Sequence, residues 1–386
     1  MAAARLGITW SLSAVHGWGV FGVNLVRELL RLERPDPLLL RETPEALLSP
    51  ADVAWLRPLL DEGERLRAET AGEPVTLGDA TVLHSLGNGL GYNPASNQFR
   101  GERNVGVAFV EDTRIGDADV ERLAALDAMV AGSTWNAELL ADAGFGNVAC
   151  VQQGIDGNAF KPGPGPGAFG DRFTVFSGGK LEFRKGQDIV VAAFRRFHES
   201  HPDAVLVTIW QNPWPETMAS MAESPHGAGA PDARLAGDQS INQWVRAQGV
   251  SENAHVDLGA IANPALPDVL RDMDVALFPN RCEGGTNLVA MEAMATGVPG
   301  IIAANTGQKD LVADEHCWAL TQQPPVPDPD GSRRGWGESD IDEIVAALEA
   351  AHTDTDARRA RGEQAARFMA GWSWRRQVSR LLDAAG

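Results

Sequence analysis

Residues 275–303 read VALFPNRCEGGTNLVAMEAMATGVPGIIA, and this stretch carries the pattern that decides the fold. Two short apolar runs, Val275–Phe278 and Gly300–Ala303, are typical of buried strands. The segment LVAMEAMA between them is apolar nearly all round, as expected of a packed helix. Thr286 or Asn287 is a suitable N-cap for that helix. A strand, a helix and a second strand in this order predict a parallel β-α-β unit.

One carboxylate interrupts the apolar helix. Glu292 lies in line with Leu288 and Ala295, where a buried carboxylate is costly unless another group binds it. A ribose diol could donate two hydrogen bonds to it. The alternative is a bond to a neighbouring backbone group or arginine.

The alternation of strand-like and helix-like segments continues on both sides of this unit, which predicts an α/β fold with parallel sheets. The expected strands are at residues 6–10, 37–40, 80–84, 105–110, 128–131, 148–152, 173–177, 204–210, 254–258, 275–278 and 300–303.

A stretch dense in glycine and proline, Gly154–Gly170, predicts an inter-domain linker. We therefore expect two Rossmann-like, doubly wound domains that face each other across a cleft. Residues 1–155 would form the first domain and residues 156–371 the second. Ligands of such folds bind in the crevice at the carboxyl ends of the strands.

Composition excludes several classes of protein. The chain has 386 residues, and 33 basic against 52 acidic residues give a net charge of −19, so we expect neither nucleic acid nor an anionic membrane surface as a partner. No apolar run reaches the roughly 18–20 residues of a membrane-spanning helix.

The start of the chain has no signal-peptide pattern. Three distant cysteines without a Cys-x-x-Cys pair fit a reducing compartment, so we expect a cytoplasmic protein. The sequence does not indicate the oligomeric state.

A glycine-rich motif follows the first expected strand. Residues 17–22, GWGVFG, match G-x-G-x-x-G, and one interpretation is a dinucleotide-binding loop. We favour a close-approach loop in which the backbone at Gly19 faces a phosphate or sugar, with His16 and Trp18 lining the pocket. A tight turn with a surface tryptophan is the third interpretation. Trp18, Trp210 and Trp214 are candidates for stacking on a sugar.

A basic loop follows the strand at residues 173–177. The segment GGKLEFRKG places Lys180, Arg184 and Lys185 between the end of that strand and a helix that Gly186 opens. Phosphate groups bind at this position in α/β folds. A solvated basic loop is the alternative.

Taken together, these motifs resemble family 4 of the glycosyltransferases, retaining enzymes of the GT-B fold. Several ordered motifs at matching intervals are more specific than any one of them. The resemblance also implies that the closing helix, residues 372–386, crosses back to the first domain. The similar segments are QQGIDGNAFKP (152–162), FSGGKLEFRKGQDIVVAAF (176–194), VDLGAI (256–261), DVLRDMDVALFPNRCEGGTNLVAMEAMATGVP (268–299) and GWSWRRQVSRLLD (371–383).

The resemblance implies roles for individual residues on the donor side. Lys180 and Lys185 would hold the diphosphate of a nucleotide-sugar donor, Glu292 its ribose, and Glu283 the hydroxyls of the transferred sugar. Eight residues separate Glu283 from Glu292, whereas the family has seven, and the extra residue lies in the turn. Backbone groups that would contact sugar or phosphate belong to Gly284, Gly285, Thr286, Asn287 and Leu288.

The acceptor side is less defined. Glu111-Asp112 ends the strand VGVAFV where the family often has His-Asp, and Glu111 would act there catalytically or bind acceptor hydroxyls. His84, after the strand ATVLH, would lie at the cleft edge or have a structural role. The acceptor is an unidentified hydroxyl compound.

The implied reaction is retaining transfer through front-face attack, in which the lysines stabilise the departing diphosphate. No cofactor or metal is expected, and the Asp-x-Asp triplets of this acidic chain are attributed to chance. Double displacement through Glu283 or Glu111 stays open. The alternatives are a GT-B sugar-nucleotide epimerase, an NAD-dependent oxidoreductase that uses the glycine motif, and a binding protein without activity.

Overall fold

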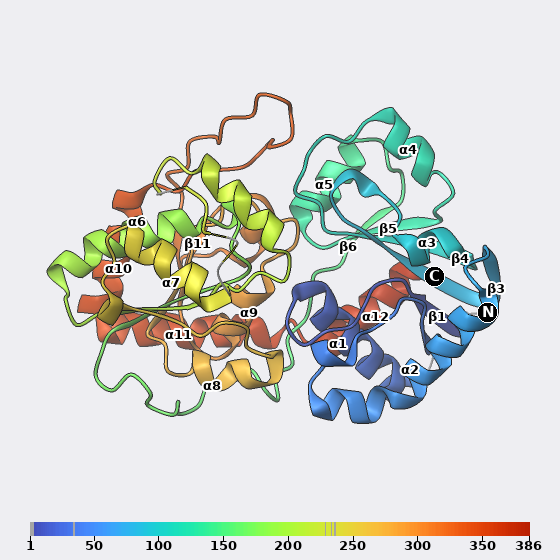
Figure 1. Ribbon diagram of the computed structural model, residues 1–386, viewed down its shortest axis with the longest axis horizontal. Coiled ribbons are helices and arrows are strands. Elements are labelled where there is room, and N and C mark those ends of the chain that lie inside the picture. Colours follow the sequence, from blue (N-terminus) through green and yellow to red (C-terminus); the bar gives the residue numbers. More distant parts are fainter. Residues whose placement is uncertain (1–3, 34, 228, 233, 235–236) are drawn as a thin grey trace.

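The computed structural model describes residues 4–33, 35–227, 229–232, 234 and 237–386. Two parallel six-stranded sheets form the framework of two halves that lie side by side (Figure 1). The first sheet has the order β2-β1-β3-β4-β5-β6, and the second β12-β11-β10-β7-β8-β9. The strands are β1 (Arg5–Ile8), β2 (Asp36–Leu39), β3 (Val75–Leu86), β4 (Phe99–Ala108), β5 (Ala128–Ala131), β6 (Val148–Cys150), β7 (Thr174–Gly178), β8 (Val205–Ile209), β9 (His255–Asp257), β10 (Val275–Phe278), β11 (Gly300–Ala303) and β12 (Cys317–Leu320).

Helices connect successive parallel strands in both halves and cover the sheets (Figure 1). They are α1 (Gly17–Leu32), α2 (Pro50–Thr70), α3 (Pro94–Gln98), α4 (Asp117–Leu123), α5 (Thr134–Asp142), α6 (Gln187–Ser200), α7 (Gly237–Ala247), α8 (Leu266–Leu270), α9 (Leu288–Ala295), α10 (Ile341–Thr353), α11 (Thr355–Ala370) and α12 (Trp374–Ala385).

The predicted β-α-β unit is confirmed as β10-α9-β11, with β10 and β11 paired in parallel. Asn287 is the N-cap of α9, and its side chain accepts a hydrogen bond from the Ala290 amide. Nearly every side chain of α9 is buried, which agrees with its uniformly apolar sequence. The pattern of this segment alone was therefore sufficient to predict its structure.

Four expectations were wrong in detail. The expected strands at 80–84 and 105–110 are parts of the longer β3 and β4, and β4 ends before residue 109. The edge strand β12 was not expected. Helix α2 was missed because Pro58 and Gly63 interrupt its pattern, although packing of Gly63 against the Leu39 carbonyl holds it on the sheet. The glycine motif is not a turn, because α1 begins at Gly17.

The polar stretch after β8 was expected to be irregular as far as Gly237. Residues 215–223 form a 3₁₀ helix in the structure, and residues 228, 233 and 235–236 of this stretch lie outside the described residues.

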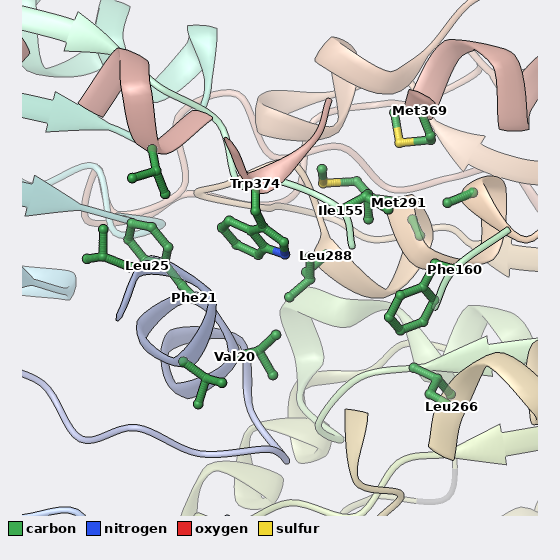
Figure 2. Close-up of a cluster of buried hydrophobic side chains, with 14 of the residues drawn as sticks. Val20, Phe21, Leu25, Ile155, Phe160, Leu266, Leu288, Met291, Met369 and Trp374 are labelled. Atoms are coloured by element: carbon green, nitrogen blue, oxygen red, sulfur yellow. The ribbon is translucent and has the colours of Figure 1, made fainter. Parts of the chain in front are cut away.

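One apolar core runs through both halves. Val20, Phe21 and Leu25 of α1 belong to the same buried cluster as Leu288 and Met291 of α9. Figure 2 shows the indole ring of Trp374 between these two groups, with Phe21 on one side and Leu288 on the other. The halves are therefore held together by continuous apolar packing as well as by the chain that connects them.

Helix α12 returns to the first half, as predicted, and packs against α1 and β5 (Figure 1). The return begins where Ile155 forms a parallel bridge with Ser373. Trp374 then stacks on Phe21, with ring centroids 5.8 Å apart. Gly154 lies so close to this helix that a Cβ atom there would be 2.6 Å from the backbone nitrogen of Trp374.

This close approach gives a stability prediction. We expect Gly154→Ala to lower the free energy of unfolding by about 1–3 kcal/mol, because the methyl group overpacks the contact between the linker and α12. Gly157→Ala is the matched control, since a Cβ atom there has no neighbour within 4 Å. Denaturant unfolding of both variants checks the prediction, and equal midpoints would contradict it.

Candidate active site

A cavity of about 590 Å³ opens between the two halves. Its walls are segments that follow β1, β2, β3, β4 and β6 in the first sheet and β7, β8, β9 and β10 in the second, together with the first turns of α1 and α9. Loops at the carboxyl ends of parallel strands are where doubly wound folds bind their ligands. The volume is that of a small-molecule site.

A buried carboxylate in this cavity is held by two cations. Lys185 Nζ lies 2.5 Å from Glu283 Oε1, and Arg184 Nη1 lies 3.0 Å from Glu283 Oε2. Asn280 donates a further hydrogen bond to Glu283 Oε1. Burial opposes the charge of Glu283, but Lys185 and Arg184 outweigh it and lower the pKa of this carboxyl. Glu283 is therefore ionised at neutral pH.

Arg184 contacts carboxylates from both halves. Its Nε lies 2.6 Å from Glu182 Oε1, and its Nη2 lies 3.4 Å from Glu111 Oε1 of the first half. Lys180 Nζ pairs with the other oxygen of Glu182 at 3.0 Å. Although burial lowers it, the pKa of Arg184 is raised by Glu111, Glu182 and Glu283. Arg184 is thus the common counter-ion of three carboxylates, whereas each lysine pairs with one.

The lysines are therefore the cations that an incoming anion can engage most readily. Burial lowers the pKa of Lys185, against the opposing effect of Glu283. Lys180 lies over the ring of Trp214, with Nζ 5.2 Å from the ring centroid. A diphosphate would replace one carboxylate at each lysine and leave the carboxylates paired with Arg184.

The turn that carries the cations is fixed from behind by Arg281. This fully buried side chain donates to the Phe183 carbonyl at 2.6 Å and forms a bidentate pair with Asp188 at 2.7 and 2.8 Å. Gly186 has φ 69°, and a Cβ atom there would be 2.5 Å from the Pro279 carbonyl oxygen. Only glycine allows this approach, which brings Lys185 next to the end of β10.

Glu292 does not line the cavity. It is 3% exposed, and its Oε1 accepts a hydrogen bond from Asn263 Nδ2 at 2.5 Å. The backbone N–H of Asn263 in turn donates to the Ala14 carbonyl of the first half at 2.6 Å. Burial raises the pKa of Glu292 to about 8, although the bond from Asn263 lowers it. Asn263 therefore donates to Glu292 a hydrogen bond of the kind predicted for a ribose hydroxyl.

Some residues of the turn before α9 line the cavity, and others pack against neighbouring parts of the protein. Gly285, Asn287 and Leu288 line the cavity. Thr286 is buried, and its hydroxyl donates to Met291 Sδ at 3.0 Å. Gly284 does not line the cavity, because it packs against the first half and its carbonyl accepts from Ser133 Oγ at 2.7 Å.

On the predicted acceptor side, His16, Trp18 and Glu111 line the cavity. His16 Nδ1 accepts from the Gly19 amide at 3.1 Å, so the proton of the neutral ring is on Nε2. Burial, aided by the charge of Lys180, lowers the pKa of His16. The loop at residues 324–337 supports Glu111, since Trp336 Nε1 donates to the Glu111 carbonyl at 3.1 Å.

Four further candidates do not line the cavity. Asp112 pairs instead with Arg114. His84 is fully buried within β3 and bonds to Asn104 at 3.0 Å, and burial lowers its pKa to about 4, so its role is structural. The Gly19 amide is used by His16, and Gly19 packs against Ser13. Trp210 is fully buried and donates to Ser177 Oγ, so it does not stack on a ligand.

The sequence did not indicate the contacts that three residues make here. Arg184 was grouped with Lys180 and Lys185 at the expected phosphate site, but its contact with Glu111 was not expected, because nothing in the sequence places Glu111 beside it. Arg281 gave no signal apart from being a lone arginine in an apolar run. Asn263 gave no signal at all.

The packing of Gly284 leads to a prediction about turnover. A Cβ atom at this position would lie 2.7 Å from the Val110 backbone nitrogen, so Gly284→Ala should push the Glu283 turn away from the first half. We expect turnover to fall about 10²-fold, because such misplacement separates Arg184 from Glu111. Nucleotide affinity should change little, because Lys180, Lys185 and Glu292 all belong to the second half.

Steady-state kinetics and calorimetry test this separation of effects. Gly116→Ala is the control, since its Cβ atom would have no neighbour within 4 Å. Unchanged turnover in Gly284→Ala, or an equal loss of nucleotide affinity, would show that the contact does not align the two halves.

Among the described residues, no group of three or more His, Cys, Asp or Glu side chains could hold a metal ion. In the same part of the chain we find no helix with the length and apolar character needed to cross a bilayer.

Solved structures show that this arrangement is the GT-B fold. Sucrose-phosphate synthase from Thermosynechococcus elongatus superposes with a TM-score of 0.62 at 15% identity, over 98% of this chain and 97% of that chain. HepE from Anabaena, in complex with UDP and glucose, gives a TM-score of 0.62 at 14% identity, over 99% of both chains. At these identities the likeness shows the fold alone.

Residues 133–381 match the family described as Family 4 Glycosyltransferase in conflict systems, and the chain belongs to this family. GDP-mannose-dependent alpha-(1-6)-phosphatidylinositol monomannoside mannosyltransferase of Mycobacterium tuberculosis is 30% identical over 180 residues, which are 42% of this chain and 40% of that protein. D-inositol 3-phosphate glycosyltransferase of Stackebrandtia nassauensis is 27% identical over 281 residues, 70% of this chain and 56% of that protein. The chain spans about half the length of these curated relatives. The family assignment made from the ordered motifs is confirmed.

Proposed function

We propose that the chain transfers a hexose from a nucleotide-diphosphate sugar to a hydroxyl group, with retention of configuration and without a metal ion. The observation that carries this proposal is the pair of lysines in the inter-domain cavity. Lys180 and Lys185 both precede α6, at the carboxyl end of β7, where a phosphate would be bound. Membership of family 4 supports the same activity.

The difficult step is departure of the nucleoside diphosphate, which carries negative charge away from the sugar. Lys180 and Lys185 would stabilise this charge from fixed positions in a partly enclosed site, where an electrostatic interaction is stronger than in water. The arrangement of Arg281 and Gly186 behind the turn keeps these cations in place before the reaction begins. The chemistry therefore needs no metal ion to neutralise the leaving group.

The environment of Glu283 supports the front-face route over double displacement. Its carboxylate oxygens are already engaged by Lys185, Arg184 and Asn280. A carboxylate stabilised in this way is a weak nucleophile, because attack would require these contacts to be given up. In the proposed mechanism Glu283 orients the sugar hydroxyls, and a donor phosphate oxygen takes the acceptor proton.

The rival activities explain less of the site. An NAD-dependent oxidoreductase would use the glycine motif, but the Gly19 amide already donates to His16. An epimerase would need the donor pocket without an acceptor, and a binding protein would need no aligned charges across the two halves. Location in the cytoplasm remains part of the proposal.

Calorimetry with UDP, GDP, ADP and NADH, in the absence of metal, tests the proposal. One relative is named as GDP-mannose-dependent, and HepE was solved in complex with UDP. The titrations therefore include both GDP and UDP. We expect one nucleoside diphosphate to bind, and Lys185→Ala and Glu292→Ala to weaken its binding. Binding of NADH alone, unaffected by both substitutions, would overturn the proposal.

A further inference from the structure

The wall that the first half contributes to the cavity is mainly apolar. Val15, Trp18, Leu47 and Phe109 lie on it, near the predicted acceptor carboxylate Glu111. A wall of this kind favours a ligand surface that is itself apolar, because water leaves both surfaces on binding.

The polar side chains on this wall are held in place by hydrogen bonds within the protein. Asn88 Oδ1 accepts from the amides of Glu111 and Asp112 at 2.7 and 3.0 Å. Gln153 Nε2 donates to the Gly17 carbonyl at 3.3 Å, and His16 Nδ1 accepts from Gly19. A polyol acceptor would place several hydroxyls against the apolar side chains of the wall, where they lose hydration without gaining a partner, which is unfavourable.

The mouth of the cavity carries exposed apolar side chains. Trp214 is 41% exposed and Val15 36% exposed, and they come from opposite halves. The rings of Trp214 and His16 contact each other there, with centroids 5.4 Å apart and planes inclined by 55°. Among the described residues only Leu30 and Leu32 are comparably exposed large apolar side chains, and both lie at the other end of α1. Apolar side chains exposed together at a pocket mark a ligand surface.

From these observations we infer that the acceptor is an uncharged alcohol with an apolar body, not a polyhydroxylated sugar. Its body packs between the Val15–Leu47 wall and Trp214, and its single hydroxyl reaches toward Glu111 and the donor. This inference rests on the proposed function and adds the chemical class of the acceptor. The body can be flat and aromatic or a flexible alkyl chain.

The test uses the full chain with the nucleotide-sugar that matches the nucleotide bound in calorimetry. Release of the nucleoside diphosphate and formation of glycoside are measured with 2-phenylethanol, n-octanol, glycerol and methyl α-glucoside. We expect kcat/KM to be at least about tenfold higher for the two apolar alcohols, since one methylene group in an apolar pocket is worth roughly this factor. The better of the two apolar alcohols then distinguishes an aromatic body from an alkyl one.

A variant pair links this preference to the wall. We expect Val15→Ser/Leu47→Ser to raise KM for the apolar alcohol about tenfold, and slow donor hydrolysis is measured in the same preparations. The control, Leu30→Ser/Leu32→Ser, makes the same change at exposed positions away from the cavity. Equal or better use of glycerol or methyl α-glucoside, or an unchanged KM in the first variant, would overturn the inference while donor hydrolysis still supported the proposed function. Absence of both nucleotide binding and donor hydrolysis would overturn the proposed function itself.

Discussion

Lys185→Ala should lower the rate of sugar transfer about 10²–10³-fold, because it removes a fixed cation aimed at the leaving diphosphate. The effect should appear mainly in kcat, since the negative charge on the diphosphate grows as the bond to the sugar breaks. Binding of the nucleoside diphosphate should also weaken, because Lys185 is one of the two lysines at the end of β7. Steady-state kinetics and calorimetry on the same preparation measure both effects.

Lys185 also has a structural partner, so the experiment needs controls. Removing one member of a buried ion pair costs about 3–5 kcal/mol of stability, and Lys185→Ala leaves Glu283 with one cation fewer. Lys185→Met/Glu283→Gln removes both charges and restores much of that stability, but it should not restore transfer. Lys161→Ala removes an exposed lysine and should behave as the wild type. A stable double variant with wild-type kcat would show that Lys185 acts only as the counter-ion of Glu283 and not on the leaving group.

The second large effect is a pH dependence at Glu292. Burial raises the pKa of this carboxyl to about 8, so at pH 7 it is neutral. A ribose diol donates hydrogen bonds, which favours the ionised carboxylate. We therefore expect nucleoside affinity to rise as pH increases from 7 toward 8 and to level off above 8. Glu292→Gln should bind more weakly above pH 8 and should lack this rise.

Stability should change in the opposite direction. The native carboxyl keeps its proton up to about pH 8, whereas the unfolded one loses it near 4.5, so the native state binds more protons between these values. The unfolding free energy of the wild type should therefore fall relative to Glu292→Gln as pH rises, by up to about 1.4 kcal/mol per unit.

Comparing wild type with Glu292→Gln at each pH cancels the effect of other titrating groups on affinity and stability. Using a nucleoside without phosphates as the ligand removes the contribution of Lys180 and Lys185 to binding. Asn263→Ala provides a further check. If Asn263 occupies the ribose position, its removal should strengthen nucleoside binding at pH 8. Parallel pH profiles for wild type and Glu292→Gln would show that Glu292 does not titrate in this range.

The sequence determined the elements that depend on local pattern. The β10-α9-β11 unit and the basic turn before α6 follow from apolar periodicity, capping residues and short motifs, which depend on residues close together in the chain. The return of α12 was implied by the resemblance to the family. The same motifs were sufficient to assign the family. Local pattern was insufficient for α2, because Pro58 and Gly63 weaken its helical signal and only packing on the first sheet compensates for them.

Only the tertiary structure decided which charges meet. Arg184 and Glu111 are far apart in the chain, and their contact exists because the carboxyl ends of β4 and β7 face the same cavity. The sequence indicated that Glu292 needs a partner, but the fold supplied Asn263, through a loop held to Ala14 of the first half. His84 looked like a cleft residue until β3 extended beyond it and buried it. Burial and long-range pairing depend on how the two sheets pack, and no local pattern in the sequence records that packing.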